Sequence, residues 1–220
     1  MKVLVIAPHP DDEVLGCGGT IVKHTKEGDE VYLCIVTKAY TPDWSEEFIK
    51  NRPKEIQKAN DVLGIKKTFF LDLPTAKLDT IAQKQLNELI HKCINEVRPE
   101  IMYIPYEHDL HRDHRLVFEA CTVALRPMSN PSVRKILSYE TLSESDWSLL
   151  NPHSFTPNIY VDISDTLEDK IRAMSVYKSE LRPFPYPRSL EAIKILAQKR
   201  GIEAGLSAAE AFMLIRETIV

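Results

Sequence analysis

The sequence lacks the long apolar run that a membrane-spanning helix requires. None of its 220 residues fall in a stretch near the roughly 18 uninterrupted apolar positions of a bilayer span. The apolar opening, residues 3–7, stops at Pro8. It also has no small-residue cleavage site, so it does not read as a secretory signal peptide. We therefore expect no membrane span and a cytoplasmic location.

An excess of positive charge is also absent. The chain carries 28 Lys and Arg against 32 Asp and Glu, a net charge of −4. Nucleic-acid binding depends on basic groups that replace counterions, so nucleic acid is not expected as a partner. A hydrophobic content of 44% with 27% charged residues excludes a disordered or collagen-like chain. The length and the absence of a long linker predict a single domain over residues 1–220.

Cysteine is sparse and forms no CxxC pair. The four cysteines, Cys17, Cys34, Cys93 and Cys121, occur singly within apolar patterns. This spacing fits neither a disulfide scaffold nor a cysteine metal site. We predict four buried free thiols in a reducing compartment.

Strand and helix patterns alternate through the first half of the chain. Apolar, β-branched runs predict strands at residues 2–7, 30–37, 67–73 and 100–104. Helical spacing of apolar residues separates these runs, although Pro53 predicts a break or a new first turn within its segment. No short-turn hairpin joins the early strands. The pattern therefore predicts an α/β fold, a Rossmann-like three-layer sandwich with a mainly parallel sheet.

The second half is less regular. It predicts a helix at residues 113–125, strands at 133–141 and 158–163, and a helix at 166–181. Three prolines in residues 182–187 then predict an irregular connection.

Acids and histidines gather directly after the first and fourth predicted strands. Residues 8–13 read PHPDDE and residues 106–114 read YEHDLHRDH. Both clusters are expected at the carboxyl ends of parallel strands, where α/β sheets bind ligands. Several carboxylates close together repel one another unless a cation neutralises them, which indicates a divalent metal. Two histidines and one carboxylate with an open position are typical of catalytic zinc.

The first cluster also has a simpler interpretation. Asp11, Asp12 and Glu13 could cap a helix and complement its dipole, as acids do in many helices. Glu13 could alternatively hold a ligand histidine from behind. Two clusters at matching strand ends favour the metal.

These clusters resemble the PHPDDE and HxDH motifs of the LmbE-like, or PIG-L, family of zinc-dependent N-acetylglucosaminyl de-N-acetylases. Residues 8–13 match the first motif and residues 111–114 the second. The likeness continues through residues 52–55 and 209–212 and so spans nearly the whole chain, with residues 126–154 matching least.

The resemblance implies roles for the residues of both motifs. Three residues would hold one zinc per chain, with Fe²⁺ or another divalent metal as the alternative: His9, Asp12 and His114. Asp11 would be the general base that takes a proton from the attacking water. His111, protonated, would act as the electrophile or acid, with Asp113 as its orienting partner.

The implied reaction is hydrolysis of an N-acetyl group from an N-acetylglucosamine-type sugar or conjugate, a small-molecule partner. Arg52, His108 and Arg188 are the candidate substrate-binding residues, although Arg52 could instead make a helix-surface ion pair with Glu55, three residues later. Arginines of the C-terminal part, Arg182, Arg188 and Arg200, could grip a phosphate or be solvated charges. Two alternatives stay open: an amidase for larger acyl groups, and a Rossmann-type nucleotide- or sugar-binding module without catalysis. The sequence leaves the particular sugar, the native metal and a homo-oligomer undecided.

The remaining glycines and histidines are given structural roles. Gly16, Gly18 and Gly19 are expected to let a helix pack closely on the sheet, since their order does not match a dinucleotide-binding loop. Surface or packing roles are expected for three histidines: His24, His91 and His153.

Overall fold

The computed structural model describes residues 1–130, 132–148 and 154–219, so His153 lies outside the described residues. The strands are β1 (Lys2–Ala7), β2 (Glu30–Lys38), β3 (Lys67–Pro74), β4 (Ile101–Ile104), β5 (Lys135–Tyr139), β6 (Ile159–Asp162) and β7 (Ala209–Glu217). The helices are α1 (Asp12–Lys26), α2 (Glu46–Leu63), α3 (Gln83–Val97), α4 (Arg112–Ala124), α5 (Leu167–Met174) and α6 (Leu190–Ala204). A short 3-10 turn, η1 (Leu78–Thr80), precedes α3.

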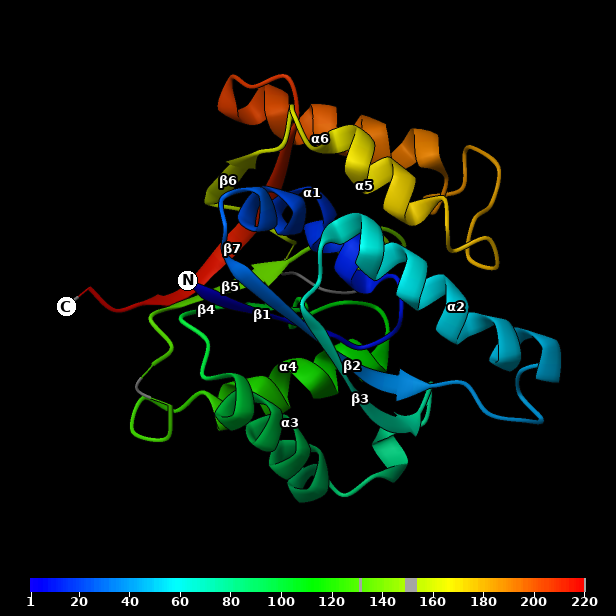
Figure 1. Cartoon of the computed structure of the whole chain (residues 1–220), viewed down its shortest axis with the longest axis vertical. Helices are drawn as coiled ribbons and strands as arrows, with labels where there is room; N and C mark the ends of the chain where they lie inside the picture. The colour runs from blue at the N-terminus through cyan, green and yellow to red at the C-terminus, as the bar shows by residue number, and fades with distance from the viewer. Residues whose placement is uncertain (131, 149–153, 220) are drawn as a thin grey trace.

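The strands form one sheet in the order β3-β2-β1-β4-β5-β7-β6. The first five of these are parallel neighbours, and β7 runs antiparallel between β5 and β6. Helices α1, α2, α5 and α6 cover one face of the sheet, and α3 and α4 cover the other (Figure 1). The predicted three-layer, mainly parallel α/β fold is confirmed.

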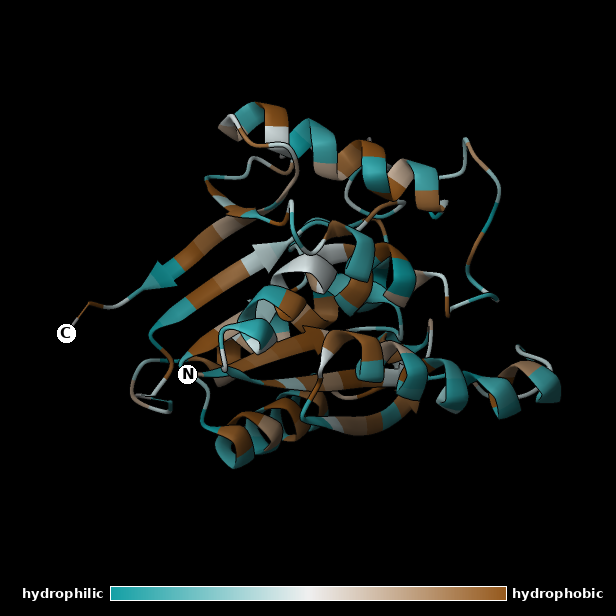
Figure 2. Ribbon diagram, turned by 45° about the horizontal axis from the view of Figure 1, so that its top comes forward, coloured by the Kyte–Doolittle hydropathy of each residue, from teal (hydrophilic) through white to brown (hydrophobic). Residues whose placement is uncertain are grey.

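Alternating residues of the central strands build a core on each face. In β1, Val3 and Val5 pack beneath α1 and α2, whereas Leu4 and Ile6 face α3 and α4. All four side chains are fully buried. Figure 2 shows the central strands as a hydrophobic band between the helices. A strand covered on both faces is apolar at consecutive positions, which is why the first two strands could be read from the sequence.

Helix α1 packs closely on the sheet through its glycines. A methyl group added at Gly16 would lie 2.2 Å from the ring of Tyr139, and one at Gly19 would lie 2.8 Å from Ile163. The Tyr139 hydroxyl donates to the Ile6 carbonyl at 2.8 Å, which fixes the ring beneath the helix. The predicted close packing on the sheet is confirmed for Gly16 and Gly19, whereas Gly18 lies against Lys170 of α5. This packing sets the height of the helix whose first turn carries the acidic motif.

The predicted break at Pro53 is wrong. Helix α2 continues through this residue. Proline cannot donate to the carbonyl four residues back, at a cost of about 3 kcal/mol in a helix interior. Burial of Ile56, Ala59 and Leu63 against the core offsets that cost and holds the helix on one axis.

The C-terminal part differs most from the sequence pattern. The helix predicted at residues 166–181 ends at Met174, and α6 and β7 were not predicted. The apolar residues of α6 are spread around the helix, so they form no clear stripe. Residues 182–187 form the expected irregular connection.

Two expectations from the composition can be compared with the fold. All four cysteines are buried and unpaired, as predicted. Within the described ranges, no helix combines the length and apolar character needed to cross a bilayer.

Candidate metal centre and active site

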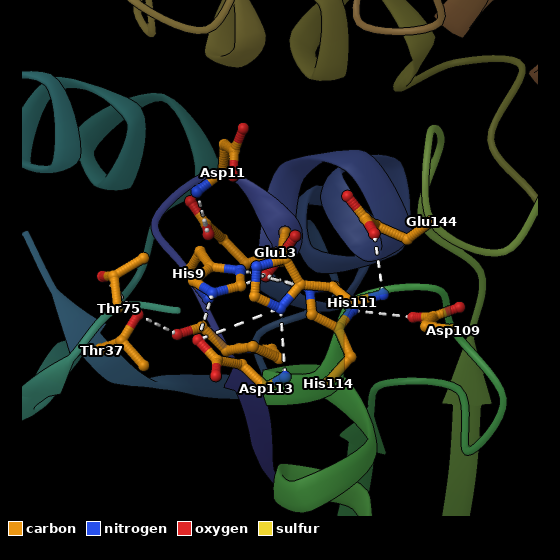
Figure 3. Close-up of polar contacts among 12 residues, drawn as sticks. His9, Asp11, Glu13, Thr37, Thr75, Asp109, His111, Asp113, His114 and Glu144 are labelled. Atoms are coloured by element: carbon orange, nitrogen blue, oxygen red, sulfur yellow. Dashed lines mark hydrogen bonds and ion pairs between the residues drawn. The ribbon is translucent and has the colours of Figure 1, made fainter. Parts of the chain in front are cut away.

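The two acid-and-histidine motifs meet where β1 and β4 lie side by side. The strand order reverses between these strands, and such a switch point opens a crevice at the carboxyl ends. His9 follows β1 by two residues, and His114 lies in the first turn of α4, after β4. Figure 3 shows side chains from both motifs converging on this edge.

Three side-chain atoms there form a nearly equilateral triangle. His9 Nδ1 is 3.3 Å from His114 Nε2 and 3.4 Å from Asp12 Oδ2, and the third side, His114 Nε2 to Asp12 Oδ2, is 3.2 Å. Donor atoms of a tetrahedral zinc with bonds of about 2.0–2.1 Å lie roughly 3.3 Å apart. Asp12 Oδ1 is buried without a hydrogen-bond partner. These residues therefore fit a divalent metal, as the family resemblance implied for this trio.

The outward nitrogen of His114 is held by an acid to which the sequence interpretation gave no role. His114 Nδ1 donates to Asp109 Oδ2 at 2.8 Å, and Ser145 Oγ donates to the other oxygen of Asp109 at 2.5 Å. Carboxylates behind metal-binding histidines fix the ring and its tautomer. Asp109 lies five residues before His114 within the same motif, and that spacing was the available signal.

The carboxylate of Asp113 holds His9 rather than His111. His9 Nε2 donates to Asp113 Oδ2 at 3.0 Å, and the backbone N–H groups of Ala76 and Leu78 fix the same carboxylate at 2.7 and 3.2 Å. The closest approach of this carboxylate to His111 is 4.0 Å. The expected orientation of His111 by the Asp113 side chain is therefore wrong, because the backbone of the segment leading into η1 holds the carboxylate beside His9.

His111 is instead the N-cap of α4. Its Nδ1 accepts the backbone N–H of Asp113 at 3.1 Å, which leaves the proton of the neutral ring on Nε2. Burial lowers the pKa of His111 to about 4, and the neighbouring His9 and His114 add to the effect. The geometry therefore describes a neutral hydrogen-bond donor rather than the expected imidazolium.

Asp11 has a left-handed backbone that is fixed by Glu13. Its φ is 112°, and its N–H donates to Glu13 Oε2 at 3.0 Å, while the Tyr177 hydroxyl donates to Glu13 Oε1 at 2.7 Å. These bonds bring Glu13 to no ligand histidine, so the expectation that it supports one is not met. Burial raises the pKa of Glu13 to about 7, against the opposing effect of Tyr177.

The pKa values of the two adjacent aspartates, Asp11 and Asp12, are shifted in opposite directions. Burial raises the pKa of the Asp11 carboxyl well above its ordinary value, with the charge of Arg188 opposing. Burial would also raise the pKa of Asp12, but the charge of His114 and hydrogen bonds from His114 and His9 hold it well below its usual range. One carboxyl is therefore suited to take a proton and its neighbour to remain an anion.

A cavity of about 470 Å³ opens beside the triangle and is lined by His9, Asp11 and His111. Of the predicted substrate-binding residues, Arg52 and Arg188 line it. His108 is not among the lining residues in the described part of the chain, and its ring packs edge-on against Tyr106 at 5.6 Å.

Arg182 and Arg200 make contacts within the fold and do not line the cavity among the described residues. Arg182 donates to the backbone carbonyls of Ser179 and Leu181, and Arg200 is paired with Glu140 and Glu203. Arg188 is different, because it donates to Asp11 Oδ2 at 3.1 Å. Arg188 lies in the irregular connection before α6, so no sequence pattern indicated its contact with Asp11.

Asp109→Asn is expected to weaken metal binding by about tenfold and Asp109→Ala by about 100-fold. The side-chain oxygen of asparagine can still accept the hydrogen bond from His114, but without a negative charge it no longer makes the imidazole more basic. Alanine removes the hydrogen bond as well, so the ring is no longer held in place. Titration of the apoprotein with Zn²⁺ in competition with a chelator would measure both. Asp146→Asn, exposed in the segment after β5 and next to Ser145, is the matched control, and unchanged affinity in both Asp109 variants would contradict the role assigned here.

Comparisons with known proteins cover both motifs. A family model described as GlcNAc-PI de-N-acetylase, PIG-L, matches residues 4–125. A diacetylchitobiose deacetylase of Thermococcus kodakarensis is 34% identical over 193 residues, 81% of this chain and 70% of that protein. A probable N-acetyl-α-D-glucosaminyl L-malate deacetylase 2 of Bacillus anthracis is 24% identical over 215 residues, 93% of this chain and 88% of that protein. The solved N,N′-diacetylchitobiose deacetylase of Pyrococcus horikoshii has a TM-score of 0.77 at 25% identity and covers 98% of this chain and 84% of its own.

Proposed function

The chain belongs to the PIG-L family, and from this premise we propose that it is a metal-dependent hydrolase that removes the N-acetyl group from an N-acetylglucosamine-type sugar or sugar conjugate. The expectation of a deacetylase-class enzyme is confirmed by the family and its relatives, and the non-catalytic binding module is set aside. The observation that carries the reaction is the donor triangle, which borders the same cavity as Asp11 and His111.

The metal would be held by the triangle of His9, Asp12 and His114. Zinc is the metal we propose, one per chain, with Fe²⁺ or another divalent ion as the alternative because imidazole and carboxylate ligands suit several metals. When bound, such a metal supplies a Lewis acid that lowers the pKa of a water and polarises the amide carbonyl.

Asp11 is proposed as the general base. Its buried carboxyl, with a raised pKa, can accept the proton of the attacking water near neutral pH. Arg188 holds this carboxylate by one oxygen. As the C–N bond breaks, the same proton is available for the nitrogen of the departing amine.

His111 is proposed to stabilise the negative charge that develops on the carbonyl oxygen. Its Nδ1 is occupied by the Asp113 N–H, so Nε2–H is the donor for that oxygen. A fixed donor of this kind favours the tetrahedral state over the planar amide. Glu144 accepts the backbone N–H of His111 at 3.1 Å and so helps to hold the residue in place.

A panel of acetylated sugars tests the proposal. Protein of measured metal content would be incubated with N-acetylglucosamine, N,N′-diacetylchitobiose and N-acetylglucosaminyl malate, and acetate would be quantified. We expect acetate and a free amine in equal amounts from at least one of them. Turnover of N-butanoyl or N-benzoyl analogues only would favour the amidase alternative, and no acetate from any compound at full metal loading would overturn the proposal.

We also propose the cytoplasm as the location of the enzyme. The support is the set of four buried, unpaired thiols, which suits a reducing compartment.

A further inference from the structure

The positive charge of Arg52 is already matched within the cavity wall. Its guanidinium donates to Glu180 through Nη2 and lies 3.5 Å from Glu55 through Nη1. The side chain is 11% exposed, so water does little to screen these pairs. One arginine therefore faces two carboxylates.

The positive charge of Arg188 is balanced by three carboxylates. Its guanidinium lies 3.1 Å from Asp11, 3.2 Å from Glu144 and 3.4 Å from Glu180. Together with Arg52, two guanidinium groups thus meet four different carboxylates. A carboxylate or phosphate on a substrate would have to displace one of these acids, which would leave a buried anion without its partner.

The third cation that lines the cavity offers no strong anchor. Lys38 is half-exposed and faces Asp72 at 3.6 Å. An exposed ammonium of this kind is strongly hydrated and contributes little to binding. Among the described residues of the lining, every Lys and Arg therefore has an acid within 4 Å.

The remaining wall of the cavity is apolar and aromatic. Trp44, Phe48 and Phe70 line it, and the Arg52 guanidinium lies 4.4 Å from the centre of the Phe48 ring. Aromatic faces of this kind pack against the C–H faces of sugar rings, and the cavity encloses enough space for more than one ring.

One buried donor beside this wall is ion-paired but makes no hydrogen bond. Arg52 Nη1 makes no hydrogen bond within the described structure. A buried N–H left unpaired costs free energy, which a ligand oxygen would recover. The neighbouring Glu55 and Glu180 make a neutral hydroxyl or ether oxygen a better acceptor here than a further anion.

We infer that the cavity selects an uncharged N-acetylglucosaminide, whose group beyond the acetylated ring stacks on the aromatic wall, and disfavours conjugates that carry a carboxylate or phosphate. The inference rests on the proposed function and narrows its substrate class. The pairing of both arginines with carboxylates disfavours an anionic substrate, and the aromatic wall independently favours an uncharged sugar ring.

Kinetics of the wild-type enzyme test this selection directly. We expect kcat/KM for N,N′-diacetylchitobiose to exceed that for N-acetylglucosaminyl malate and for N-acetylglucosamine 1-phosphate by about tenfold or more. Equal or better turnover of either anionic compound would overturn the inference and leave the deacetylase function intact. No acetate from any of the three would overturn the proposed function itself.

Charge variants test the cause of the selection. Glu180→Gln removes the acid shared by both arginines and is expected to raise the anionic-to-neutral ratio of kcat/KM by about threefold or more. Glu55→Gln gives the same test should the first variant fail to fold. Glu47→Gln, exposed at the start of α2, is the control with an unchanged ratio. An unchanged ratio in the folded Glu180 or Glu55 variant would overturn the inference.

An aromatic variant tests the apolar wall. Trp44→Ala is expected to raise KM for diacetylchitobiose by about fivefold with little change in kcat. Trp147→Ala, whose ring is 44% exposed and stacks on Tyr186 outside the cavity lining, is the control. An unchanged KM in the Trp44 variant would overturn the assignment of this wall to the substrate.

Discussion

Asp11→Asn is expected to lower kcat by about 1,000-fold, within the range of general-base catalysis, while the protein keeps its full metal content. The amide cannot accept the proton of the attacking water, yet it has the same size and can still accept from Arg188. Asparagine also tolerates the left-handed backbone at this position, where φ is 112°. Acetate release and elemental analysis of the same preparation would measure the two quantities.

The matched control for this variant is Asp72→Asn. Asp72 also lies at the cavity with a positive φ, 53°, but its carboxylate is half-exposed and faces Lys38. We expect kcat to stay within about threefold of wild type, as for most exposed substitutions. A fall in kcat of less than about tenfold in Asp11→Asn would contradict the assignment of Asp11 as the base.

His114→Ala is expected to abolish both metal binding and turnover. The change removes one corner of the donor triangle and leaves Asp109 and Asp12 without their shared imidazole. Chelation of the wild-type enzyme should reproduce the loss of activity and lower Tm by about 5–10 °C. This follows from about 2.7 kcal/mol of stabilisation at a metal concentration 100 times Kd and about 2–4 °C per kcal/mol for a chain of this size.

His91→Ala is the control for the metal experiment. His91 lies in α3, contacts Asn95 of the same helix and belongs to none of the clusters that could hold a metal ion among the described residues. This variant should keep its metal and its activity, and readdition of Zn²⁺ should restore chelated wild type. Equal metal loss in Asp11→Asn and His114→Ala would refute the division of their roles.

Local patterns in the chain account for the central sheet and for the position of the site. Strands β1 and β2 are apolar on both faces, so their composition alone marks them as buried. Residues that follow parallel strands emerge at one edge, which is why the motifs at residues 8–13 and 106–114 could be expected to meet. The close packing of α1 could likewise be predicted from its glycines, because three of them fall within one turn of the helix.

Local patterns do not report contacts between distant segments. Whether Asp113 supports His9 or His111 depends on the segment that leads into η1, where the backbone N–H groups of Ala76 and Leu78 hold its carboxylate beside His9. The spacing of Asp109 from His114 is a local signal, but only the packing of the loop before α4 decides that Asp109, rather than Glu13, supports a metal-binding histidine.

The cavity wall depends on the same kind of long-range packing. Arg188 reaches Asp11 across 177 positions of the chain, and Arg52 meets Glu180 across 128. Local sequence patterns determine the path of the backbone, the burial of apolar residues and the position of the motifs. The partners of each buried charge are chosen only when helices and loops pack over the sheet edge, because a charge removed from water binds whichever opposite group that packing brings within reach.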